Sequence, residues 1–129
     1  MNEKIIYKDL SYKIVGIVYK VYNDLGYGYQ EKYYKNAISL EFDKEHLGYN
    51  RKKEIKLNYS GKNIGRYFLD FIIENKIILE IKITNYFHSR DIKQILGYLK
   101  SAKLKLGILV LVTPNGIKCK RIINPTGIQ

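Results

Sequence analysis

The stretch that decides the fold reads Asp70-Phe71-Ile72-Ile73-Glu74-Asn75-Lys76-Ile77-Ile78-Leu79-Glu80-Ile81-Lys82. Two apolar, strand-like runs flank its polar triplet, residues 74–76, and this pattern is typical of a β-hairpin with a tight turn. With Asn75 at the centre of the turn, Asp70 falls directly opposite Glu80. Facing residues of an antiparallel pair point to the same side of the sheet, with Cβ atoms roughly 4.5–5.5 Å apart.

The hairpin therefore sets two carboxylates side by side in an apolar segment. Like charges this close destabilise strand pairing, and an unpaired buried charge is costly unless its pKa shifts. A divalent cation removes the conflict, because Mg²⁺ prefers one or two carboxylates together with waters and phosphate oxygens. We therefore predict that Asp70, Glu80 and the carbonyl of Ile81 hold a divalent metal. Lys82 shares the face of Glu80 and suits metal-assisted hydrolysis of a phosphodiester. The alternative is a structural ion cluster at the end of a strand pair.

Hydrophobic periodicity and turn residues predict the remaining elements. We expect a first helix from about Leu10 to Gly26 and a second from about Gln30 to Leu47, with Gly48 as the glycine that ends it. Strands are expected at 51–59, 64–73, 77–83, 106–112 and 117–123, with a third helix at about 89–103. The order α-α-β-β-β-α-β-β predicts a single α/β domain over residues 1–129, with a mixed central sheet flanked by helices.

Composition limits the partners and the setting of the protein. The chain has 129 residues and a formal net charge of +11, which favours a polyanionic partner such as nucleic acid or an anionic membrane surface. A lysine-rich compositional bias is the alternative explanation. Cys119 is the single cysteine, so no internal disulfide forms and a reducing, cytoplasmic setting is expected. A zinc site is excluded, since it needs more Cys and His ligands. The sequence shows neither a signal peptide nor an apolar run of the ~20 residues that span a membrane.

Helical positions supply further candidates. Glu31 either compensates the dipole of the second helix or belongs to the site, and Tyr34 is either a core residue or a hydrogen-bonding partner of Glu31. Gln94 and Tyr98 share one face of the third helix. They are either a half-buried amide and ring, or groups that fix a phosphate and pack near a substrate strand. A basic, tyrosine-interleaved stretch is either a solvated face or a phosphate track: Lys52, Lys53, Lys56, Lys62 and Arg66.

Taken together, these motifs resemble the PD-(D/E)XK nuclease superfamily, and most of all its small GxxExxY branch. The naming motif reads Gly28-Tyr29-Gln30-Glu31-Lys32-Tyr33-Tyr34. Residues 64–70, followed by Glu80-Ile81-Lys82, resemble the central hairpin with its E-x-K. Residues 94–98 resemble the Q-x-x-x-Y motif of RecB-like and Cas4-like nucleases. Leu69 stands where the superfamily name has proline. The resemblance runs from about residue 10 to residue 123.

This resemblance implies a restriction-endonuclease-like core and a Mg²⁺- or Mn²⁺-dependent phosphodiesterase acting on DNA. By position, Asp70 and Glu80 would be metal ligands and Lys82 the catalytic lysine. Glu31 would be the helix-borne acid that completes the metal site.

The same resemblance makes Gln94 and Tyr98 an accessory pair, which favours action on ends or single-stranded segments. Two rival hypotheses remain. One is a catalytically silent nucleic-acid-binding module or partner subunit with the same fold, and the other is a purely structural or protein-interaction role. The protein is expected to pair as a homodimer or to serve as a module of a larger assembly.

Overall fold

The computed structural model describes residues 5–125, and its elements follow the predicted order. The helices are α1 (Lys8–Leu25), α2 (Glu31–Lys44) and α3 (Ser89–Ala102). The strands are β1 (Tyr49–Tyr59), β2 (Lys62–Ile73), β3 (Ile77–Ile83), β4 (Leu106–Thr113) and β5 (Gly116–Ile123). They form one sheet in the order β1-β2-β3-β4-β5, in which β3 and β4 are parallel and the other neighbours antiparallel. The predicted mixed α/β sheet is confirmed.

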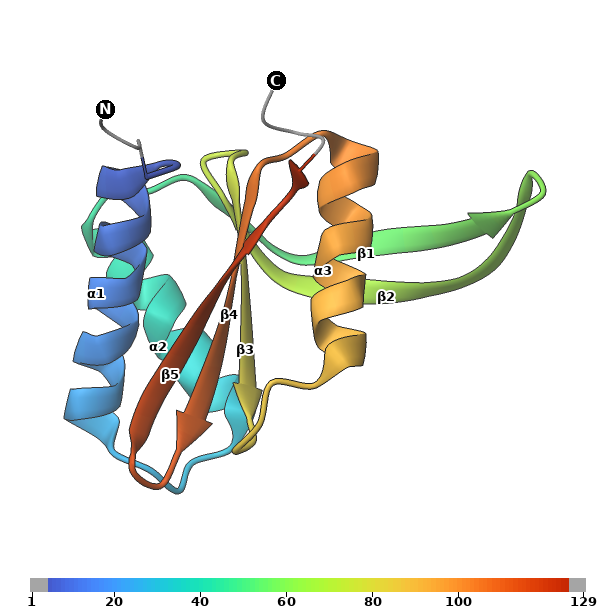
Figure 1. The fold of residues 1–129 in the computed structure, drawn as a ribbon. Helices are drawn as coiled ribbons and strands as arrows, with labels where there is room; N and C mark the ends of the chain where they lie inside the picture. Colours follow the sequence, from blue (N-terminus) through green and yellow to red (C-terminus); the bar gives the residue numbers. More distant parts are fainter. Residues whose placement is uncertain (1–4, 126–129) are drawn as a thin grey trace.

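Helices cover both faces of this sheet, with α1 and α2 on one side and α3 on the other (Figure 1). Each side has its own apolar core, and every residue of β4 is buried between them. The helix α3 packs against Gly107 of β4, where an added Cβ would lie 2.5 Å from Cγ2 of Ile95. Glycine is therefore needed at this position because it alone lacks that atom.

The strands β1 and β2 continue past the sheet as a two-stranded arm that projects from the body, which we define as residues 53–69 (Figure 1). The strand β2 pairs with β3 only through residues 71–73, whereas its pairing with β1 extends to Lys62 near the tip. Lys52 takes a left-handed conformation (φ 54°) between the pairs Arg51↔Phe71 and Lys53↔Leu69, so it faces Asp70. The arm therefore leaves β3 at Asp70.

The end of α2 corrects one prediction. The helix stops at Lys44, and Gly48 does not end it. His46 takes the left-handed conformation instead (φ 55°), and its N–H donates to the Asp43 carbonyl. The N–H of Leu47 donates to the carbonyl of Phe42. These two bonds form a Schellman motif that satisfies the last carbonyls of the helix. The chain is then free to begin β1 at residue 49.

Candidate functional site

The predicted hairpin register is confirmed, and it brings Asp70 and Glu80 together. Phe71 pairs with Leu79, and the register continued by one step sets Asp70 opposite Glu80. The strands separate at this step, and the two side chains replace the missing ladder bonds. The N–H of Asp70 donates to Glu80 Oε1 at 2.8 Å, and the N–H of Ile81 donates to Asp70 Oδ2 at 2.7 Å. Each carboxylate thus satisfies a backbone amide that the parting strands leave open.

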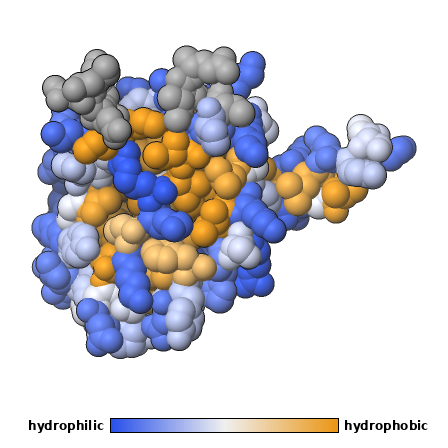
Figure 2. Space-filling model, in the orientation of Figure 1, coloured by the Kyte–Doolittle hydropathy of each residue, from blue (hydrophilic) through white to orange (hydrophobic). Residues whose placement is uncertain are grey.

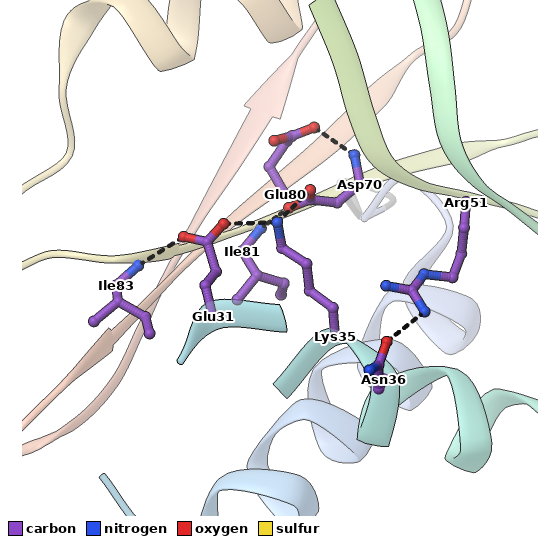
Figure 3. A network of polar contacts seen from close by, with 8 residues as sticks. All are labelled: Glu31, Lys35, Asn36, Arg51, Asp70, Glu80, Ile81 and Ile83. Atoms are coloured by element: carbon purple, nitrogen blue, oxygen red, sulfur yellow. Dashed lines mark hydrogen bonds and ion pairs between the residues drawn. The ribbon is translucent and has the colours of Figure 1, made fainter. Parts of the chain in front are cut away.

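A lysine absent from the sequence prediction lies at the centre of this cluster. Lys35 Nζ is 2.7 Å from Glu31 Oε2 and 2.7 Å from Asp70 Oδ1 (Figure 3). The Lys35 and Asp70 side chains are only 17% and 12% exposed. The ammonium therefore supplies the counter-charge that the sequence argument assigned to a metal. The i, i+4 spacing from Glu31 along α2 was the available signal.

The GxxExxY motif explains how Glu31 reaches this place. Gly28 has a φ of 120°, a conformation that other residues rarely adopt. The buried Tyr34 donates its hydroxyl hydrogen to the Gly26 carbonyl and accepts a hydrogen bond from the N–H of Tyr29. Tyr34 is thus a core residue that fixes the loop before α2 and does not bond to Glu31. The loop sets Glu31 at the first position of α2, where its Oε1 accepts the N–H of Ile83 at 3.4 Å.

Burial perturbs the ionisation of Glu80. Glu80 is 7% exposed. Burial together with the charge of Asp70 raises its pKa to about 8, against the opposing effects of the Asp70 N–H, Lys82 and Lys35. Glu80 is therefore largely protonated at neutral pH in the metal-free protein. Burial alone would lower the pKa of Lys35, but its hydrogen bonds and ion pairs with Asp70 and Glu31 outweigh burial and raise it. Lys35 stays a full cation.

The E-x-K residues divide between the two faces of β3. Ile81 packs with the core on the α1 and α2 side, and Ile78 packs with the α3 core. Glu80 and Lys82 therefore belong to the α3 side by strand alternation. The carbonyl of Ile81 points to the same strand edge as its N–H, which is the gap that Asp70 spans. Lys82 is half-buried, and its ammonium makes no hydrogen bond or ion pair with any residue in the range 5–125.

These groups fit a divalent cation in donor chemistry. No three Asp, Glu, His or Cys side chains within residues 5–125 are gathered as a ready metal cluster. The Glu80 carboxylate bonds to the Asp70 N–H. Glu31 and Asp70 nevertheless already share one cation, the Lys35 ammonium. Two carboxylates and a carbonyl oxygen match the hard ligands that Mg²⁺ and Mn²⁺ prefer.

A polar depression of about 440 Å³ opens beside Glu31 and Lys35. Its lining includes Glu31 together with basic side chains of α2 and β1, namely Lys32, Lys35, Arg51 and Lys52. Arg51 is held by Asn36, whose Oδ1 accepts a hydrogen bond from Nη1 at 2.9 Å (Figure 3). Positive side chains around an opening attract anions such as phosphate. Lys52 was predicted from the sequence as a phosphate-track candidate, whereas Arg51 and Asn36 were not.

The predicted accessory pair lies elsewhere. Gln94 and Tyr98 border a groove of about 310 Å³ between α3 and the arm. In the part of the chain that the structure describes, no hydrogen bond joins them to the carboxylates. Tyr67 of the arm lies between the two places: its hydroxyl donates to the Gln94 carbonyl at 2.9 Å. Burial and then the charges of Glu80 and Tyr98 raise its pKa.

The mixed sheet, opened beside an acidic pair and flanked by helices, defines a restriction-endonuclease-like α/β protein. The sequence model of the PD-(D/E)XK nuclease superfamily matches residues 8–121, so the chain belongs to this superfamily.

Other comparisons add little to this assignment. Among solved structures, the crystal structure of SSO0001 is 21% identical, with a TM-score of 0.47, and the match covers 88% of this chain and 79% of that one. No curated protein matches the chain. No helix within residues 5–125 is long and apolar enough to cross a membrane.

Proposed function

We propose that the protein is a divalent-metal-dependent nuclease that hydrolyses phosphodiester bonds of DNA. One observation carries the proposal: Glu31 and Asp70 share a cation at the point where β2 and β3 part, beside the E-x-K of residues 80–82. Superfamily membership supports the activity. The GxxExxY branch, the preference for ends or single-stranded segments, and a homodimer or larger assembly stay predictions.

The residues of the site have two proposed roles, metal binding and the positioning of water. Glu31, Asp70 and the carbonyl of Ile81 would hold Mg²⁺ or Mn²⁺, and Glu80 would join them once it loses its proton. When bound, the metal polarises a phosphate oxygen and lowers the pKa of water. Lys82, whose ammonium makes no hydrogen bond or ion pair with residues 5–125, positions the attacking water and offsets the negative charge that develops on the phosphate.

The basic side chains of the depression complete the proposal. Lys32, Arg51 and Lys52 line its wall and would hold the phosphate backbone next to the acidic pair. Such contacts position a nucleic acid without reading its sequence.

A second candidate function is a nucleic-acid-binding module without turnover. Lys35 favours it, because the ammonium already balances Glu31 and Asp70 without a metal. This candidate predicts salt-dependent binding that does not require a divalent cation.

Cleavage of end-labelled single-stranded, duplex and flap DNA in Mg²⁺, Mn²⁺ or EDTA separates the two functions. Asp70→Asn and Lys82→Ala are compared with Asp24→Asn, which changes an exposed carboxylate of α1. We expect metal-dependent cleavage that each site variant lowers at least about 100-fold and the control leaves intact. DNA binding without cleavage under every condition would support the binding module instead.

A further inference from the structure

The arm exposes apolar side chains that nothing in residues 5–125 covers. Leu57 and Tyr59 are 44% and 70% exposed, and they share a face with Ile55 and its cross-strand partner Tyr67. Figure 2 shows hydrophobic residues among hydrophilic ones along this projection. A two-stranded ribbon without a third strand or a covering helix is marginally stable in water. The arm is therefore a surface suited to a partner.

Charge determines which kind of partner fits. Four basic side chains and one acidic side chain lie within the arm, residues 53–69. The acidic one, Glu54, is paired with Arg66 at 2.9 Å. A second copy of the arm would meet this surface with charge of the same sign, whereas a polyanion would be attracted. Aromatic rings interleaved with cations suit a polyanion that carries flat bases.

The helix α3 forms the opposite wall of the groove at the base of the arm. The bond from the Tyr67 hydroxyl to the Gln94 carbonyl ties the two walls together. Gly97 lies in the lining, and a Cβ added there would meet no atom within 4 Å. The glycine therefore leaves the middle of the groove open. Lys56 of the arm and Lys93 of α3 are both in its lining.

We propose that this groove binds a single strand of nucleic acid, with bases against Tyr67 and Tyr98 and phosphates on Lys56 and Lys93. Unpaired bases offer ring faces for stacking, whereas a duplex hides them, so the groove selects single strands. This inference rests on the proposed function, because Tyr67 lies three residues before Asp70, about 10 Å along β2. A strand in the groove thus leads toward the acidic pair.

Gly97 allows a test that removes no existing contact. Fluorescence anisotropy measures binding of a labelled oligothymidine and of a duplex of equal length, in EDTA so that no metal or cleavage is involved. Gly97→Glu puts a carboxylate into the groove, and Gly97→Ala is the matched control that leaves it open. We expect the Glu variant to bind the oligothymidine at least about tenfold more weakly than the Ala variant. The unmodified protein should bind the single strand more tightly than the duplex.

Two further measurements keep the test decisive. Circular dichroism and thermal melting establish that both Gly97 variants fold. Lys93→Ala should reduce the slope of log affinity against log salt concentration by the contribution of about one phosphate contact. Lys13→Ala, on α1, should leave this slope unchanged. Equal binding by the Gly97 variants, or tighter binding of the duplex, overturns the inference. If the groove binds the single strand but no metal supports cleavage, the proposed nuclease activity is contradicted. If cleavage occurs and Gly97→Glu does not change it, only the proposed binding in the groove is contradicted.

Discussion

Replacing Lys35 with Met tests whether its ammonium occupies the place of a metal. Methionine keeps an apolar stem of similar length and removes the charge that Glu31 and Asp70 share. Removing one partner of a buried ion pair costs ~3–5 kcal/mol. Because Lys35 is 17% and Asp70 12% exposed, we expect the lower end, about 3 kcal/mol. The metal-free variant should lose that much free energy of unfolding in urea.

A divalent cation should recover this loss. In the unmodified protein, a metal that takes the oxygens of Glu31 and Asp70 must displace the ammonium, and in Lys35→Met it need not. If the whole 3 kcal/mol returns on binding, Mn²⁺ affinity rises about 100-fold, at 1.4 kcal/mol for each factor of ten. Isothermal titration calorimetry measures the affinity directly. Urea unfolding with and without Mn²⁺ gives the same quantity through linkage.

The control is Lys20→Met, which removes an exposed lysine that pairs with Asp24 and Glu41 away from the site. It should leave Mn²⁺ affinity unchanged. Equal or weaker Mn²⁺ binding by Lys35→Met would refute the competition and make Lys35 a support for the carboxylates. Failure of both proteins to bind Mn²⁺ would refute the metal centre itself.

Two further predictions concern protonation and packing. The pKa of Glu80 is raised to about 8, so the folded protein binds more protons than the unfolded chain between about pH 4.5 and 8. The free energy of unfolding of the metal-free protein should therefore fall as pH rises through this window. Glu80→Gln should abolish that fall in urea titrations at several pH values, and a fall that persists in the variant would assign it to another group. Gly107→Ala should destabilise the protein by about 1–3 kcal/mol because the methyl group meets Ile95. Gly16→Ala, where the added Cβ meets nothing within 4 Å, should stabilise α1 by about 0.5–1 kcal/mol. Equal effects of Gly107→Ala and Gly16→Ala on the free energy of unfolding in urea would contradict the packing argument.

Local rules were enough to predict the hairpin and most of the fold. The polar triplet between two apolar runs fixed the turn, and period-two pairing then placed Asp70 opposite Glu80, one step beyond the observed pair Phe71↔Leu79. The apolar run at 106–112 likewise predicted a strand, which forms β4 and is buried at every residue. The end of α2 could not be predicted in this way, because a histidine takes the left-handed position that usually goes to glycine.

The separation of β2 from β3 could not be predicted from sequence periodicity. It coincides with the left-handed conformation of Lys52, on a strand that the E-x-K pattern does not include. The role of Lys35 could not be predicted for a related reason, since the spacing within the hairpin gives no sign of a counter-charge from another element. A lysine on α2 supplies it across a long separation in sequence. Both omissions concern contacts between elements, which periodicity does not encode.

The double role of the carboxylates decides which variant distinguishes the two candidate functions. Asp70 and Glu80 each accept a backbone N–H at the opened end of the hairpin, so the fold has reason to keep them whether or not the protein cleaves DNA. Loss of cleavage in an Asp70 variant therefore mixes catalysis with local structure. Lys82 is different, because its ammonium makes no hydrogen bond or ion pair with residues 5–125. Lys82→Ala should leave stability and DNA binding intact while it abolishes cleavage, and only a nuclease would show that separation.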